Sequence, residues 1–204
     1  PHGRVLGCDI SENAITQARA YAENSSLKNI DFEVQEISDC LGAFGKEKLD
    51  VVLMTEVIFF YPEWVKDLPR IIQILKPGGL LVLSFRSQYF NALCLARNRI
   101  WNGVESLIKN RQGSVFGGST MFTWQTSTEI RDLLIKTHGL ELLELHGIGV
   151  CSGIPGDSHD SICQPSKLLE HEKVELMKLE LEIGKNTPDG GRYILAVARK
   201  PIHK

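Results

Sequence analysis

The sequence predicts an α/β fold in which a doubly wound, mostly parallel sheet carries helices. Short apolar runs alternate along the chain with segments whose apolar residues recur at helical spacing, and the connections between them are short. Two runs, residues 49–54 and 80–85, are apolar almost throughout, as is typical of strands covered on both faces of a parallel sheet. With 204 residues, 43% of them hydrophobic, the chain fits one globular domain.

The first predicted strand ends in an acid. An apolar run leads to Asp9, and Ser11 then stands where a helix N-cap belongs, followed by alanines at helical spacing. In open α/β sheets ligands bind at the carboxyl ends of the strands, where an acid can accept hydrogen bonds from ribose hydroxyls. An Asp-x-Ser sequence is equally typical of an ordinary helix start, where the cap stabilises the first turn by about 1 kcal/mol. The residues alone leave both interpretations open.

Two further strands are followed by acids in the same way. Residues 30–35 alternate apolar and polar, which predicts a strand near a sheet edge, and Glu36 follows it. The buried run at 49–54 is followed by Thr55 and Glu56 and then by aromatic residues. Each of these acids could instead belong to an ordinary polar turn. Aromatic residues are more often part of a hydrophobic core than in contact with a ligand.

The next elements are predicted from proline, glycine and capping signals. Pro69 predicts the first turn of a short helix, and residues 76–79 end that helix before the strand at 80–85. One or two helices and a Gly/Ser-rich loop follow within residues 86–124. The spacing from Thr126 to Glu129 predicts a capping box at the start of another helix.

The last part of the chain predicts a strand at 140–145, a long excursion and a closing strand at 193–198. The excursion contains an amphipathic helix built on Leu169, Leu176, Leu179 and Ile183. We expect the two irregular stretches, about 87–124 and 151–188, to be helical insertions that cap a substrate site.

Composition excludes several classes of function. The net charge of −2 gives no field for nucleic acid, and the basic residues from Arg86 to Arg111 are interpreted as a solvated helix face rather than a phosphate site. Five scattered cysteines without a Cys-x-x-Cys pair indicate neither a disulfide framework nor a zinc site, so we expect no metal and a reducing, cytoplasmic location. No apolar run is long enough to span a bilayer.

Taken in order, several segments resemble a class I S-adenosylmethionine-dependent methyltransferase of the small-molecule branch, which includes the ubiquinone-biosynthesis type. They are residues 5–11, Glu36, residues 49–57, residues 75–79 and the terminal stretch 191–200. The resemblance covers nearly the whole chain, so we expect one methyltransferase domain over 1–204. It implies a Rossmann-like, seven-stranded sheet whose last strand inserts antiparallel, S-adenosyl-L-methionine as cofactor, and a small-molecule acceptor of unidentified atom type.

The resemblance also implies roles for six residues. Asp9 corresponds to the acid that holds the ribose hydroxyls, with Ile10 packed near the adenine. Glu36 matches the acid that accepts from the adenine amine, with Ile37 beside the ring edge. Thr55 and Glu56 fall on the strand exit that faces the methionine half of the cofactor.

The chain departs from the family pattern at two places. It starts at Pro1 almost inside a strand, and the family's first strand and glycine-rich loop, which receives the methionine carboxylate, are missing, so we expect an N-terminal truncation. Phe60 stands where many relatives carry a histidine. No catalytic residue is therefore assigned, although His146 and His159 lie on the expected substrate side as candidate bases.

Two other classes of function compete with methyl transfer. A nicotinamide-dependent oxidoreductase also places an acid after its second strand, but it does not require the Leu-Lys-Pro-Gly-Gly turn or an antiparallel last strand. The other alternative is an inactive methyltransferase-like fragment or a partner-binding module. The sequence does not indicate an oligomeric state.

Overall fold

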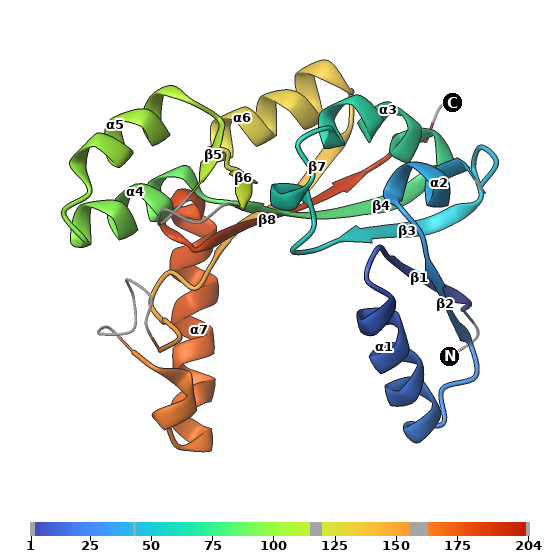
Figure 1. Ribbon diagram of the computed structural model, residues 1–204, viewed down its shortest axis with the longest axis horizontal. Coiled ribbons are helices and arrows are strands. Elements are labelled where there is room, and N and C mark those ends of the chain that lie inside the picture. Colours follow the sequence, from blue (N-terminus) through green and yellow to red (C-terminus); the bar gives the residue numbers. More distant parts are fainter. Residues whose placement is uncertain (1–2, 43, 115–119, 156–162, 203–204) are drawn as a thin grey trace. The chain divides into compact units, whose positions relative to one another are not determined.

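The computed structural model describes residues 3–42, 44–114, 120–155 and 163–202 (Figure 1). The chain divides into two compact units, residues 1–48 and residues 49–204. Each unit has its own β-ladder and is described by itself.

The unit of residues 1–48 is a β-α-β segment followed by a short helix. Its elements are β1 (Val5–Asp9), α1 (Glu12–Asn24), β2 (Ile30–Val34) and α2 (Ile37–Gly42). The two strands are parallel and in register from Val5 opposite Ile30 to Asp9 opposite Val34. The predicted cap is confirmed, because Ser11 Oγ accepts a hydrogen bond from the Ala14 N–H at 3.2 Å.

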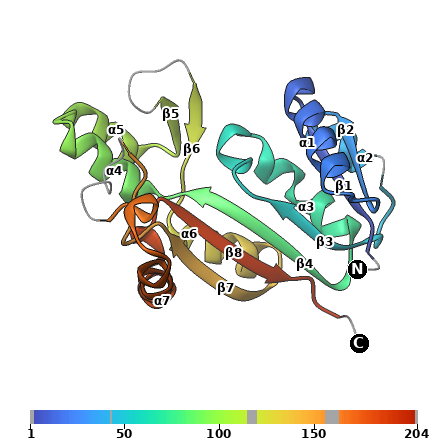
Figure 2. The same ribbon diagram turned by 90° about the horizontal axis from the view of Figure 1, so that it is seen from below.

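The unit of residues 49–204 is built on a four-stranded sheet in the order β3-β4-β8-β7 (Figures 1 and 2). Its strands are β3 (Leu49–Met54), β4 (Leu75–Arg86), β7 (Glu141–Ile148) and β8 (Tyr193–Arg199). β3 runs parallel to β4, whereas β8 lies between β4 and β7 and is antiparallel to both. The prediction that the last strand inserts antiparallel inside the sheet is confirmed.

Helices, turns and one small hairpin connect these strands. They are η1 (Ile58–Phe60), α3 (Trp64–Ile74), α4 (Gln88–Arg97), α5 (Trp101–Lys109), β5 (Gln112–Ser114), β6 (Met121–Thr123), α6 (Ser127–Arg131), η2 (Asp132–Thr137), η3 (Pro165–Lys167), α7 (Glu170–Asn186) and η4 (Pro188–Gly190). The described residues between β4 and α6 contain two helices, where one or two were predicted, and both follow the carboxyl end of β4. The capping box at Thr126 and Glu129 is confirmed. Part of the predicted Gly/Ser-rich loop, residues 115–119, lies outside the described residues, and Gly113 and Ser114 belong to β5.

The structure corrects the predicted helix start at Pro69. α3 begins at Trp64, so the proline lies inside the helix rather than in its first turn. Proline cannot donate to the carbonyl of Val65, but Val65 is exposed, which lowers the cost of the missing bond. The helix is held instead by the burial of Trp64, Leu68 and Ile71.

The structure also corrects the prediction that the strand at 49–54 is covered on both faces. Met54 is buried, but Val51 is 52% exposed and Leu53 is 64% exposed. Within its unit β3 is an edge strand that pairs with β4 alone. An apolar run therefore did not distinguish a strand covered on both faces from an edge strand with one open apolar face.

Candidate functional site

Asp9 and Ile10 lie at the carboxyl end of β1. Asp9 Oδ1 accepts a hydrogen bond from the Ser11 N–H at 2.7 Å, so this carboxylate takes part in the helix start. It is the only hydrogen bond of the carboxylate within the described residues, and Asp9 and Ile10 are both exposed. One carboxylate oxygen thus organises the turn while the other is open to a further donor.

Glu36 and Ile37 lie at the corresponding end of β2. The Gln35 N–H donates to the Asp9 backbone oxygen at 3.0 Å, and the Glu36 carbonyl accepts from the Cys40 N–H at 3.0 Å, which starts α2. Because β1 and β2 are parallel and in register, Asp9 and Glu36 stand at the same edge of this ladder. The Glu36 side chain is exposed and Ile37 is half-buried.

Thr55 and Glu56 belong to the other unit and follow the carboxyl end of β3. Glu56 has a φ of 58°, in the left-handed region that residues other than glycine seldom adopt. Its N–H donates to Ser84 Oγ at 2.7 Å, and Ser84 is buried in β4. This strained backbone at a strand exit is a frequent feature of functional sites, and no sequence signal indicated it.

An aromatic cluster continues from the same strand exit. Phe59 lies 4.6 Å from Phe60 and 5.6 Å from Tyr193 between ring centroids, and Phe60 lies 5.1 Å from Phe122. Phe59 is only 2% exposed, whereas Phe60 is 54% exposed. The cluster therefore has a buried base and an open rim.

Arg86 lies against this cluster, which corrects its interpretation as part of a solvated helix face. It is the last residue of β4, and its guanidinium carbon is 5.5 Å from the centroid of Phe59 and 5.0 Å from that of Phe122. Burial lowers the pKa of Arg86, and the positive charge of Arg192 acts in the same direction, although Tyr193 and Glu56 oppose them. The position at a strand end next to the N-cap Ser87 is the signal that could have identified Arg86 from the sequence.

Neither histidine that was a candidate general base can be assigned that role. His146 lies on β7, and its Nε2 is 2.8 Å from Glu144 Oε2. Its Nδ1 is buried and has no hydrogen-bond partner among the residues that the structure describes. His159 lies outside the described residues, so a role as general base stays a prediction for both histidines.

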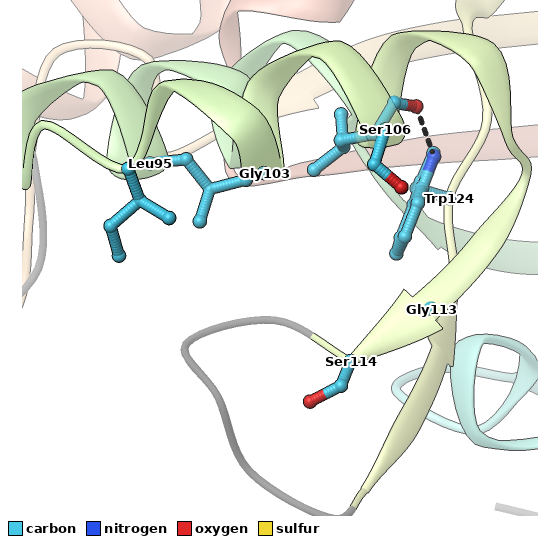
Figure 3. A pocket seen from close by; sticks show the side chains of 8 residues that line it. Leu95, Gly103, Ser106, Gly113, Ser114 and Trp124 are labelled. Atoms are coloured by element: carbon cyan, nitrogen blue, oxygen red, sulfur yellow. Dashed lines mark hydrogen bonds between the residues drawn. The ribbon is translucent and has the colours of Figure 1, made fainter.

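One small pocket lies between the helices and the hairpin that follow β4 (Figure 3). It has a volume of about 150 Å³ and is lined by Leu95, Ile100, Gly103, Ser106, Leu107, Gly113, Ser114 and Trp124. The Trp124 Nε1–H donates to the Leu107 carbonyl at 3.0 Å, which fixes the indole in the wall. The walls are mainly apolar, so this pocket suits a small apolar group rather than a charged one.

The cysteines are distributed over both units. None forms a disulfide, and no group of three potential metal-ligating side chains occurs within the described residues. Burial and a contact with Cys8 raise the pKa of the Cys40 thiol to about 12, which makes this thiol unreactive at neutral pH. Across the described residues, none of the helices has the length and apolar character needed to cross a bilayer.

Comparisons with known proteins identify a family model and several relatives that match part of the chain. A family model described as a methyltransferase domain matches residues 1–134. Demethylmenaquinone methyltransferase of Lactococcus lactis is 37% identical over 82 residues, which cover 40% of this chain and 32% of that protein. Ubiquinone biosynthesis O-methyltransferase of Roseobacter denitrificans is 41% identical over 80 residues, covering 39% of this chain and 31% of that protein.

A solved structure shows the same fold over more of the chain. It is a SAM-dependent methyltransferase from Methanosarcina mazei, with a TM-score of 0.63 at 16% sequence identity, and it covers 98% of this chain and 83% of that one. The chain spans about a third of the length of each of these two curated relatives. The predicted Rossmann-like α/β fold class is confirmed.

Proposed function

The chain belongs to the methyltransferase domain family, and from this premise we propose that the protein transfers a methyl group from S-adenosyl-L-methionine to a small-molecule acceptor. The observation that carries the proposal is the parallel β1–β2 ladder, which brings Asp9 and Glu36 to one edge in a chain of this family. Two carboxylates at such an edge fit the hydrogen-bond donors of an adenosine. The quinone methyltransferases among the relatives support a small-molecule acceptor.

Each predicted site residue has a role in this proposal. The oxygen of Asp9 that does not bond to Ser11 accepts from the ribose hydroxyls, and Ile10 packs on the adenine. Glu36 accepts from the adenine amine, beside the backbone of Ile37. Thr55 and Glu56 face the methionine half, where the strained Glu56 backbone is held in place by Ser84.

The chemistry asked of these residues is mainly positioning. When bound, the cofactor supplies a methyl group that its sulfonium has already activated. Holding donor and acceptor in line can lower the barrier by about 7–11 kcal/mol, so the residues act by orienting both partners and excluding water. Whether a base assists depends on the acceptor, and none is assigned here.

We also propose one methyltransferase domain over residues 1–204, with residues 87–124 and 151–188 as substrate-capping insertions. The position of α4 and α5 supports this organisation, because both follow the carboxyl end of β4. Insertions at that end of a strand are placed to cover a ligand.

Calorimetry on the full-length protein tests the proposed cofactor. We expect saturable binding of S-adenosylmethionine at micromolar concentration and no heat with NAD⁺ or NADPH. Binding of a nicotinamide cofactor alone would support the oxidoreductase alternative, and binding of neither would support a partner-binding module. Transfer of a labelled methyl group to an acceptor is the readout that separates an active enzyme from an inactive fold.

A further inference from the structure

Arg86 holds a positive charge at the carboxyl end of β4 that forms no ion pair with a carboxylate of the described residues, although the charge of Glu56 favours it from further away. Among the described residues, its guanidinium makes one hydrogen bond, from Nε to Asn91 Oδ1 at 3.4 Å. No acid of the described chain lies within ion-pair distance of it, and Arg192 adds a second positive charge nearby. An arginine remains charged at neutral pH, so a half-buried guanidinium of this kind is stabilised by an anion.

Asn91 provides an independent observation at the same place. Its side chain is completely buried, and its Nδ2 has no hydrogen-bond partner within the described residues. Buried amide groups are nearly always satisfied, and an unsatisfied donor calls for a ligand or an ordered water. Asn91 orients the guanidinium through its oxygen, which accepts from Arg86 Nε, whereas its amide nitrogen is enclosed in the protein and does not reach a ligand.

The aromatic cluster supplies the second half of a binding site. Phe60 is exposed at the rim and lies 5.1 Å from Phe122, on which Arg86 packs. An exposed ring close to a guanidinium favours a planar ligand ring that carries a negative charge, since the ligand ring can stack while its charge meets the arginine. A carboxylate matches the planar fork of arginine and can accept two parallel hydrogen bonds from it.

We propose that the acceptor is a planar, carboxylate-bearing aromatic compound, whose carboxylate is bound by Arg86, which Asn91 orients, and whose ring packs on Phe60 and Phe122. This inference rests on the proposed function, because an acceptor binds at the carboxyl ends of the sheet strands. All four residues belong to the unit of residues 49–204. Arg86 is then a substrate-binding residue that sets specificity and is not a catalytic one.

Fluorine NMR on the full-length protein tests the charge preference with two isosteric probes. The probes are 4-fluorobenzoate and the neutral 4-fluorobenzamide, with acetate as an anion that lacks the ring. We expect 4-fluorobenzoate to bind at least tenfold more tightly than either of the others. Equal affinities of the benzoate and the benzamide would overturn the proposal.

Three variants locate the site. Arg86→Met removes the charge and is expected to abolish the preference for 4-fluorobenzoate, whereas Arg131→Met removes an exposed arginine of α6 and should leave it unchanged. Asn91→Asp keeps the shape but places a carboxylate next to Arg86, so we expect the benzoate to be rejected. Asn91→Asp tests the site if Arg86→Met does not fold. A full preference for 4-fluorobenzoate in folded Arg86→Met or in folded Asn91→Asp contradicts the proposal.

Calorimetry with S-adenosylmethionine on the same samples separates this inference from the proposed function. Cofactor binding without any benzoate preference shows that the acceptor proposal alone is wrong. A benzoate preference without cofactor binding leaves the carboxylate site standing and removes the methyl-transfer context from it.

Discussion

At the scale of the residue, Asp9 combines two roles that its sequence pattern left as alternatives. The structure shows the helix-start role, because one carboxylate oxygen accepts from the Ser11 N–H. The same hydrogen bond fixes the carboxylate at the strand end, where the second oxygen is open to a ribose. The structural role and the proposed binding role are therefore compatible, and mutations can separate them.

We predict that Asp9→Ala weakens S-adenosylmethionine binding by ~1.5–3 kcal/mol in the full-length protein, because it removes charge-assisted hydrogen bonds to the ribose. Ser11→Ala is the matched control, since it removes the side-chain cap to Ala14 and leaves the carboxylate. We expect it to lower the free energy of unfolding by about 1 kcal/mol without changing affinity. If calorimetry shows equal affinity for Asp9→Ala and the parent, Asp9 is only part of the helix start.

Arg86 shows why part of the site could not be predicted at this scale. Its neighbours Phe59, Phe122 and Tyr193 come from η1, β6 and β8, which are distant in sequence. Charge counting grouped Arg86 with the basic residues that follow it in the chain. Only the position of Arg86 at a strand end indicates from the sequence that it belongs to a site. That position does not indicate which side chains surround it.

At the scale of the element, the sequence predicted best what is local. Ser11 and the Thr126–Glu129 box were identified because a cap depends on residues within three positions of each other. Proline preference alone places Pro69 in a first turn, whereas the burial of Trp64 sets where α3 begins. The open face of β3 was missed because an apolar run does not tell what covers it.

The capping box of α6 gives a prediction of pH dependence. Burial alone raises the pKa of Glu129, but hydrogen bonds from the Thr126 backbone, Arg111 and the Thr126 hydroxyl outweigh it, so the pKa is lowered overall. A carboxyl whose pKa is lower in the folded state stabilises the fold above its unfolded pKa of about 4.3, and this contribution is lost as the pH falls through the folded value. We expect Glu129→Gln to lower the melting temperature at pH 7. Below the folded-state pKa of Glu129, the melting temperatures of the variant and the parent should be the same.

The control for this experiment is Glu105→Gln. Glu105 forms an exposed ion pair with Lys109 one helical turn away, and pairs of this kind contribute little. Thermal melts of the two variants between pH 7 and pH 3 should therefore differ in their pH dependence. A difference between Glu129→Gln and the parent that persists unchanged into acid would show that the capping box acts by shape and not by charge.

At the scale of the whole molecule, strand order was beyond the reach of sequence pattern. The antiparallel insertion of β8 between β4 and β7 followed from the family resemblance, since apolar runs do not state which strands pair. The glycines that let distant segments touch were missed for the same reason. A Cβ on Gly184 of α7 would lie 2.3 Å from the Gly147 carbonyl oxygen of β7.

This contact fixes α7, and with it the second proposed insertion, to the sheet. Real side chains do not approach a backbone oxygen so closely, so Gly184→Ala must push the helix away from β7. Overpacking of this kind costs about 1–3 kcal/mol, while alanine regains only about 1 kcal/mol of helix propensity. Lys185→Ala, at the next and exposed position, gains propensity without any clash and is the matched control.

We predict that Gly184→Ala lowers the free energy of unfolding measured with urea, whereas Lys185→Ala leaves it within about 0.5 kcal/mol of the parent. Hydrogen exchange should locate the effect, because the amides of α7 and of the neighbouring β7 lose protection before those of β3, which lies at the other edge of the sheet. If the insertion caps the substrate site, the same variant should raise the KM for the acceptor more than that for S-adenosylmethionine. Unchanged stability and exchange in Gly184→Ala would mean that α7 is not held at Gly147, and the proposal of a second cap would lose its structural support.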